Sequence, residues 1–211
     1  MSMRVLQFSK GSELGGLAVF AKIERDLLRK HITFEPYYVD TAIKLETAQS
    51  RKGGLVRIGE IKRHISRAKA KIDTFKPDIL HIHSLLPLIT PAIIRYARSR
   101  KTPMVFTLHD YKLLYHDGMI YRNDPRRVWK DLFQPDRWKH GSLPLTLLYG
   151  YLLRYYRSIG LYNNVDRFIA PSDKLYNHFV QQGFDEDTME YVPHFMPDFS
   201  DISEDLGQEQ P

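Results

Sequence analysis

Short apolar runs alternate with longer amphipathic stretches along most of this chain. The apolar runs have the length of buried strands, and they predict strands at 4–8, 34–39, 79–82, 104–108, 167–170 and 189–192. The amphipathic stretches predict helices at 16–30, 57–75 and 172–181, and one more that begins near Pro91. Strands separated by helices are typical of right-handed βαβ crossovers, so the pattern predicts an α/β fold with a mainly parallel sheet covered by helices on both faces.

The stretch 57–75 has the clearest helical pattern. Its apolar positions step by three and four residues, and they are Ile58, Ile61, Ile65, Ala68, Ile72 and Phe75. Residues 51–76 also hold nine Lys or Arg against Glu60 and Asp73. Such a basic surface attracts the phosphates of nucleic acid, lipid or nucleotide, and its charge alone does not choose among them. A solvated helix face that binds nothing is an equally good explanation.

Composition narrows the class of protein. The chain has 211 residues, which suits one sizeable domain, and a net charge of +6. It has no cysteine, so neither a disulfide framework nor a thiolate metal site is available. The longest largely apolar run, Leu143 to Leu153, is well short of the roughly 20 residues of a membrane-spanning helix, and the first residues run straight into a strand rather than a signal peptide. We therefore expect a cytoplasmic protein.

Polar side chains stand where three of the predicted strands end. His109 and Asp110 follow the strand 104–108, and His83 and Ser84 follow the strand 79–82. Gly15 and Gly16 stand at the expected start of the first helix, where unpaired backbone N–H groups can face an anion. Because an open parallel sheet binds its ligand outside the carboxyl ends of its strands, these residues are candidates for one site.

A metal centre is one interpretation of these side chains. Imidazole and carboxylate groups suit zinc, iron or manganese, and His81, His83, His109 and Asp110 supply both. The first strand, however, ends on residues 7–9 without the Asp-x-His pattern that often opens a metallophosphoesterase. We favour a site without metal, in which His81 is a hydrogen-bonded core histidine and His109 faces a ligand.

Five segments in order resemble the N-terminal domain of a family 4 glycosyltransferase, a retaining enzyme of the GT-B fold. They are GGLAVFAKIERDLLRKH, KPDILHIHSLLP, PMVFTLHDYKLLYHDGMIYR, VDRFIAPSDKLYNHFVQQGF and YVPHFMPDF, and the resemblance covers residues 3 to about 199. Each segment alone is common, whereas five in this order and spacing are specific. The resemblance implies a Rossmann-like domain that forms the N-terminal half of a GT-B fold and binds the acceptor.

The resemblance also implies roles for the candidate residues. In that family the glycine loop approaches the donor diphosphate, and the histidine after the strand lines the catalytic site. We therefore assign His109 and Asp110 to catalysis, with Asp110 orienting His109, and we assign Gly15, Gly16, His83, Ser84 and Tyr111 to binding of substrate or diphosphate. Neither a metal nor a cofactor is expected, because helix N-termini and nearby cations can stabilise the leaving diphosphate in a closed cleft.

The same resemblance sets the expected domains and partners. Residues 1–197 are expected to form the acceptor-binding domain, and residues 198–211, with five acidic and no basic side chains, a disordered tail or linker. The family's second Rossmann-like domain, which binds the nucleotide sugar, is expected to be absent, so the isolated chain is predicted to be inactive. A truncated protein, a split subunit and a free-standing module stay open. The expected function is to hold a glycan or lipid-linked glycan acceptor for transfer from a nucleotide-sugar donor, as in cell-surface polysaccharide biosynthesis.

The sequence also bears on binding to other ligands, to nucleic acid and to membranes. A non-catalytic module that binds an anionic ligand or a partner protein is the main alternative. A nucleic-acid binder is not expected, because no RRM, KH or helix-turn-helix pattern accompanies the aromatic and basic residues of 126–138. The segment Arg137 to Tyr156 carries leucines, tyrosines and flanking arginines, and it predicts peripheral binding to an anionic membrane, on the inner face if the protein is cytoplasmic.

Overall fold

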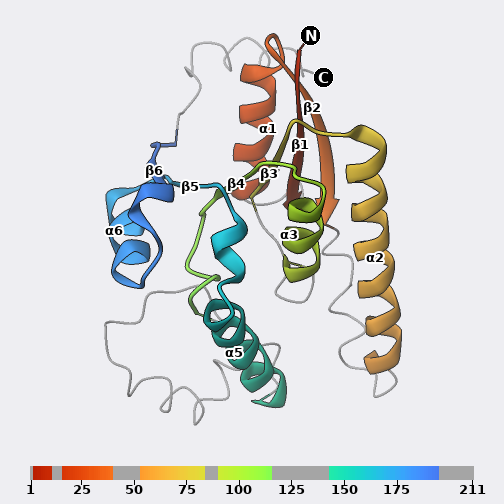
Figure 1. Ribbon diagram of the computed structural model, residues 1–211, viewed down its shortest axis with the longest axis vertical. Coiled ribbons are helices and arrows are strands. Elements are labelled where there is room, and N and C mark those ends of the chain that lie inside the picture. The colour runs from red at the N-terminus through yellow and green to blue at the C-terminus, as the bar shows by residue number, and fades with distance from the viewer. Residues whose placement is uncertain (1, 11–15, 40–52, 84–89, 116–142, 195–211) are drawn as a thin grey trace, which may run out of the picture.

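The computed structural model describes residues 2–10, 16–39, 53–83, 90–115 and 143–194 (Figure 1). Six strands lie in one sheet, namely β1 (Met3–Lys10), β2 (Ile32–Val39), β3 (Ile79–Ile82), β4 (Met104–Thr107), β5 (Arg167–Ala170) and β6 (Met189–Tyr191). The helices are α1 (Gly16–Leu28), α2 (Gly53–Phe75), α3 (Thr90–Ser99), α5 (Leu143–Ser158) and α6 (Asp173–Gln181), with short 3-10 turns η4 (Leu161–Asn164) and η5 (Glu186–Thr188). Strands and helices therefore alternate as the sequence pattern predicts.

The sheet is parallel throughout, and its strand order is β2-β1-β3-β4-β5-β6. The chain first moves from β1 outward to β2, then returns across β1 to β3 and continues in that direction. The strand order therefore reverses between β1 and β3, which is where a sheet of this kind opens a crevice for a ligand. The α/β, Rossmann-like fold predicted from the sequence is confirmed.

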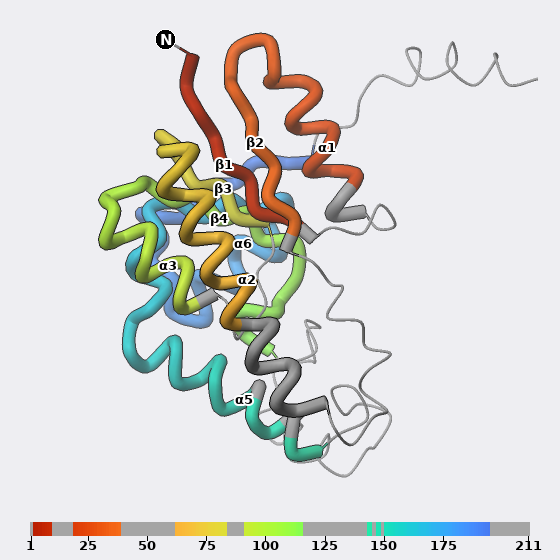
Figure 2. Tube along the Cα trace, turned by 90° about the vertical axis from the view of Figure 1, so that its right-hand side faces the viewer, coloured from red at the N-terminus to blue at the C-terminus, as the bar shows by residue number. Residues whose placement is uncertain are grey.

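The reversal in direction places the helices on opposite faces. Right-handed crossovers that run in opposite directions along a sheet lie on opposite sides of it. Accordingly α1 lies on one side of β1 and β2 and α3 on the other, as Figure 2 shows, and α2 packs beside α3. The two faces of the sheet thus meet different helices and different side chains.

The face under α2 and α3 is apolar. Leu6, Phe8, Leu80 and Ile82 of β1 and β3 are fully buried there in one hydrophobic cluster with Ala68 and Ile72 of α2 and Ile93, Ile94 and Ala97 of α3. Successive side chains of a strand point to opposite faces. The residues between them, Gln7 and His81, therefore point toward α1, and both are buried. Pairing of β1 with β3 sets these two polar residues side by side.

Local chemistry explains where α6 begins and ends and why α5 tolerates a proline. The Ser172 hydroxyl accepts a hydrogen bond from the Leu175 N–H at the start of α6, and Gly183, with φ +88°, lies two residues beyond the last residue of α6. α5 runs through Pro144 because a proline in the first helical turn displaces no intrahelical hydrogen bond. Among the helices of the described residues, none has the length and apolar content needed to cross a bilayer.

Candidate functional site

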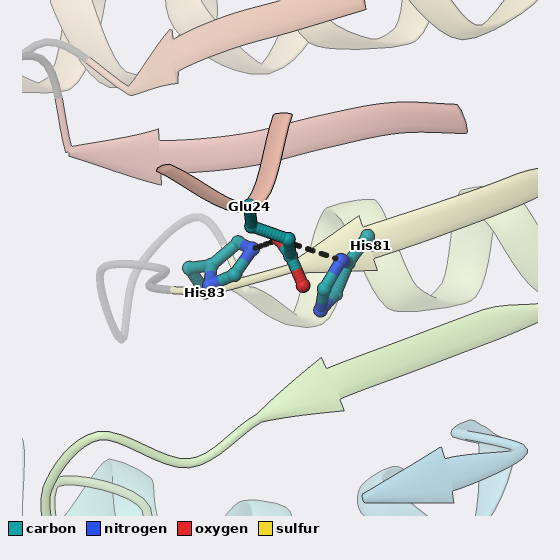
Figure 3. A group of neighbouring side chains, drawn as sticks. All are labelled: Glu24, His81 and His83. Atoms are coloured by element: carbon teal, nitrogen blue, oxygen red, sulfur yellow. Dashed lines mark ion pairs between the residues drawn. The ribbon is translucent and has the colours of Figure 1, made fainter. Parts of the chain in front are cut away.

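A buried layer of polar side chains lies between α1 and the ends of β1, β3 and β4. Glu24 reaches down from α1 and places its carboxylate between the rings of His81 and His83 (Figure 3). Its Oε2 atom lies 3.0 Å from His83 Nε2 and 3.5 Å from His81 Nδ1. The Glu24 side chain is 12% exposed and that of His83 is 0% exposed, so these groups interact with very little water between them.

Gln7 ties this cluster to the rest of α1. Its Nε2 atom donates to Glu24 Oε2 at 2.8 Å and lies 3.0 Å from His83 Nε2. Its Oε1 atom accepts from the Arg25 guanidinium at 2.6 Å. A buried amide leaves neither end unpaired in this arrangement, which is what burial of a polar group requires.

His109 extends the layer toward the edge of the sheet. Its Nε2 atom lies 3.0 Å from His83 Nδ1, and its side chain is half-buried. The His194 ring, beyond β6, stacks on it at 5.3 Å between centroids, and the Phe20 ring of α1 meets it edge-on at 5.5 Å. Three segments that are far apart in the chain therefore hold one imidazole.

Burial controls the protonation of these groups. Desolvation lowers the pKa of His81 to about 3, and the nearby His83 ring adds to this effect. It also lowers the pKa of His83 to about 3, aided by Arg25 and His194. The pKa of His109 falls to about 3 as well, because its burial and the rings of His83 and His194 outweigh the attraction of Asp110. All three imidazoles are therefore neutral at pH 7.

Glu24 has the opposite shift. Burial raises the pKa of its carboxyl above the usual value, although His81, the Gln7 amide and Arg25 all favour the charged form and limit the rise. On the other side of the cluster, His81 Nε2 lies 2.8 Å from the Thr107 hydroxyl, which is able to donate or accept. His81 is thus a hydrogen-bonded core histidine in this structure, the interpretation favoured from the sequence.

Among the described residues, one group has donor atoms close enough to share a metal ion. It consists of Glu24, His81 and His83, whose donor atoms lie within 4.8 Å of one another. Metal–ligand bonds of about 2.1 Å place neighbouring donors roughly 3.0–3.4 Å apart, close to the two separations from Glu24 Oε2. The Gln7 N–H, however, points at the same carboxylate oxygen, and the Arg25 cation lies beside it. Hydrogen bonds satisfy the group without an ion, and the expectation that no metal binds stays a prediction.

The structure separates the other predicted site residues. Asp110 accepts from the backbone N–H of Lys112 at 2.9 Å and pairs with the ammonium group of the same residue, so its hydrogen bonds go to Lys112 rather than to His109. The Tyr111 ring packs against His178 at 5.3 Å, away from the histidine layer. Gly16 is the first residue of α1, whereas Gly15 and Ser84 lie outside the described residues. The catalytic and binding roles of all these residues stay predictions.

Reasoning from the sequence missed the partners that α1 and β1 contribute. Glu24 comes three and four residues after Ala21 and Phe20, which face the sheet, so a carboxylate stands on the buried side of a helix. Gln7 is likewise a polar residue in the middle of an apolar strand. Both exceptions to the hydrophobic pattern are visible in the sequence, and they mark the polar layer.

The chain was compared with known proteins. The family description Glycosyltransferase Family 4 matches residues 50–197, which is more than half of the chain. The chain belongs to glycosyltransferase family 4. Among curated proteins no significant match was found.

Solved structures share the fold of this family 4 domain. The UDP-N-acetylglucosamine 2-epimerase of Rickettsia bellii is 11% identical, with a TM-score of 0.56, and the match covers 99% of this chain and 50% of that one. Anabaena Alr3699/HepE, solved in complex with UDP-glucose, is 15% identical with a TM-score of 0.53, and the match covers 98% of this chain and 49% of that one. The family 4 domain therefore spans about half the length of these proteins.

Proposed function

We propose that this family 4 domain is the acceptor-binding half of a retaining glycosyltransferase, which moves a sugar from a nucleotide-sugar donor to a glycan or lipid-linked glycan. The observation that carries the proposal is the neutral, half-buried His109 at the carboxyl end of β4, hydrogen-bonded to His83 beyond the end of β3, near the point where the strand order reverses and where sheets of this kind bind their ligands. A neutral imidazole at such a position suits a sugar hydroxyl, which both donates and accepts hydrogen bonds.

The start of α1 supports a place for the donor diphosphate in the same crevice. The first N–H groups of a helix have no partner within the helix and, with the helix dipole, favour an anion. α1 is described from Gly16, and the absence of a side chain there allows close approach of a ligand. Gly15 and Gly16 would hold one side of the diphosphate, and a second domain would hold the nucleotide.

Acceptor binding by the chain itself tests the proposal. Saturation-transfer NMR with a panel of oligosaccharides and short-chain lipid-linked glycans should find a binder, and His109→Ala should abolish its signal. His31→Ala is the matched control, because His31 is exposed and lies in the turn before β2. Binding that survives His109→Ala, or no glycan binding at all, would contradict the proposal. Binding of anionic ligands without any glycan would favour the non-catalytic module instead.

The donor is a separate part of the proposal. Calorimetry with UDP- and GDP-sugars is expected to show weak binding and no turnover by the isolated chain, because the groups that hold a nucleotide would belong to another domain. The Anabaena structure with UDP-glucose makes UDP-glucose a sensible first probe. Micromolar binding or turnover by the chain alone would show that no second domain is needed.

Peripheral binding to an anionic membrane is proposed for α5, since lipid-linked acceptors lie in bilayers. Tyr151 is 66% exposed, and Leu147, Leu148 and Tyr155 are exposed beside it, with Arg154 and Arg157 on the same helix. Co-sedimentation with liposomes should require anionic lipid and weaken as salt rises from about 0.05 to 0.5 M. Arg154→Glu with Arg157→Glu should weaken it further. Equal recovery in the supernatant with neutral and anionic vesicles would contradict this part.

A further inference from the structure

We propose that Glu24, His83 and His109 form one directed chain of hydrogen bonds, which fixes the tautomer of His109 and leaves its Nδ1 lone pair to accept from a ligand hydroxyl. Glu24 and His83 are then positioning residues, which act on a ligand only through His109. The use of the lone pair for an acceptor sugar rests on the proposed function. The direction of the hydrogen bonds does not, because it follows from the protein's own groups.

The direction begins at Gln7. The Arg25 guanidinium has only donors, so the Gln7 atom 2.6 Å from it must be the carbonyl oxygen. The amide nitrogen is thereby turned toward Glu24 Oε2 and donates to it at 2.8 Å. An amide placed the other way round would set N–H groups against a cation. The orientation of Gln7 is therefore set by charge.

Glu24 sets the direction of the hydrogen bond at His83 Nε2. Two directions are compatible with the distances at His83 Nε2, which lies 3.0 Å from the carboxylate oxygen and 3.0 Å from the Gln7 nitrogen. Burial raises the pKa of Glu24, but the Gln7 N–H and the Arg25 cation beside it favour its ionised form. A hydrogen bond to an ionised acceptor is roughly twice as strong as a neutral one. A bare imidazole nitrogen facing a buried carboxylate would instead leave two lone pairs opposed, which is unfavourable. His83 Nε2 therefore carries the hydrogen and donates to Glu24.

The tautomer of His109 follows from that of His83. A neutral imidazole has one donor and one acceptor nitrogen, so His83 Nδ1 is an acceptor. His109 Nε2, 3.0 Å away, must then carry the hydrogen. Its Nδ1 is left with a lone pair, and no hydrogen bond joins this atom to any group in the part of the chain that the structure describes. Stacking of His194 and the edge of Phe20 keep the ring from turning.

This arrangement selects the kind of ligand group that His109 receives. A lone pair accepts from a hydroxyl and repels the ionised oxygens of a phosphodiester or of a nucleotide-sugar diphosphate, which carry no hydrogen at pH 7. Because the pKa of His109 is lowered to about 3, the ring does not gain a proton at pH 7 that would reverse this preference. His109 is thereby tuned for a hydroxyl group, while phosphate groups are left to other parts of the crevice.

Long-range ¹H–¹⁵N correlation spectra of the histidine rings in the full chain test the proposal at pH 7. His83 and His109 should both give the pattern of the Nε2–H tautomer, and dimethyl phosphate, a phosphate without any O–H, should leave the His109 Nδ1 signal in place. A Nδ1–H pattern in either ring, or protonation of His109 in the presence of dimethyl phosphate, would overturn it. The wild-type spectrum alone decides the direction, so the result does not depend on any variant.

Glu24→Met sharpens the test by reversing the chain. Without the carboxylate, the Gln7 amide becomes the partner of His83 Nε2 and makes it an acceptor, so both rings should change to the Nδ1–H tautomer. Glu35→Met is the matched control, because Glu35 pairs with Lys71 on β2 and α2, and it should leave both rings unchanged. Unchanged rings in a folded Glu24→Met protein would overturn the proposal. The expected tautomers together with no glycan binding would instead refute the proposed function and leave the hydrogen-bond chain in place.

Discussion

The two faces of the sheet differ in what they bury: one buries apolar side chains and the other buries polar ones. Under α2 and α3, side chains such as Phe8 and Ile82 are fully buried among other apolar groups, which removes hydrocarbon from water. Under α1, the alternate positions Gln7, His81 and His83 are equally buried but polar. Burial of polar groups is unfavourable unless each finds a partner. One face therefore stabilises the domain, whereas the other holds a set of oriented groups that the first face must support.

Removing a large side chain from the apolar face should have the largest effect. Phe8→Ala deletes a ring that is fully buried and packs at 4.8 Å on Tyr37, so the free energy of unfolding should fall by about 3–5 kcal/mol. Urea denaturation measures this. The control Val19→Ala, at a position 49% exposed on α1, should change stability by about 0.5 kcal/mol or less. A loss below about 1 kcal/mol in Phe8→Ala would show that this face is not the main source of stability.

Lowering the pH should destabilise the protein through the buried histidines of the polar face. His81, His83 and His109 each have a pKa of about 3 in the folded protein and about 6.5 in the unfolded chain. Between these values only the unfolded chain binds the protons, so stability is complete above pH 6.5 and falls with pH, by at most about 1.4 kcal/mol per unit for each ring. The raised pKa of Glu24 offsets part of this.

We therefore expect urea denaturation to show a loss of roughly 2–4 kcal/mol between pH 7 and pH 5. His31→Ala, which removes an exposed histidine, should leave the pH dependence unchanged. Stability that stays constant over this interval would mean that the rings titrate in the folded protein as they do in the unfolded chain.

Truncating one member of the polar layer should have a smaller effect. His83→Ala removes the ring that partners both Glu24 and His109, and leaving buried polar groups unpaired costs about 1–3 kcal/mol. The double variant Glu24→Met with His83→Leu replaces both partners by apolar groups, and thermal and urea unfolding should show that it loses less than the two single changes added together. Strict additivity would mean that the two residues do not interact.

Loss of His109 should have the smallest effect on stability and the largest on binding. The ring is half-buried at the edge of the layer, so His109→Ala should change the free energy of unfolding by about 1 kcal/mol or less. Acceptor binding, and transfer by an enzyme reconstituted with a donor-binding domain, should nevertheless collapse. Should the variant unfold, with residual activity following the folded fraction, His109 would be a core histidine rather than a ligand-binding one.

The apolar face was predictable from the sequence and the polar face was predictable only in part. In α2, apolar residues recur every three or four positions, and the strands are short apolar runs. Both patterns indicate which residues are buried, because hydrophobic burial needs no specific partner. The position of His109 follows from the rule that ligands bind at the carboxyl ends of parallel strands. The role of Glu24 does not follow from this rule. Its place on the buried side of α1 marks it as an exception, but only the packing of α1 on β3 shows that it meets His81 and His83.

α5 shows a second limit. Leucine and tyrosine occur around much of this helix, so its apolar residues do not define one stripe, and the sequence pattern predicted no element there. The structure buries Leu153 and Tyr156 while Tyr151 and Tyr155 stack on one another outside. Which tyrosine turns inward depends on where η4 and α3 lie, and local sequence does not contain that information.

The histidine layer also has a consequence for the order of folding. Its close polar contacts join residues that are 17, 26 and 76 positions apart in the chain, whereas the contacts inside α2 are local. Closing such long loops is entropically unfavourable until β1, β3 and β4 have assembled, so the layer forms late. A chain that has been synthesised only as far as α3 has no His109 and cannot complete it. The pairing of His109 with His83 is thus a feature of the finished sheet, because in an unfolded chain both rings face water and exchange freely between their tautomers.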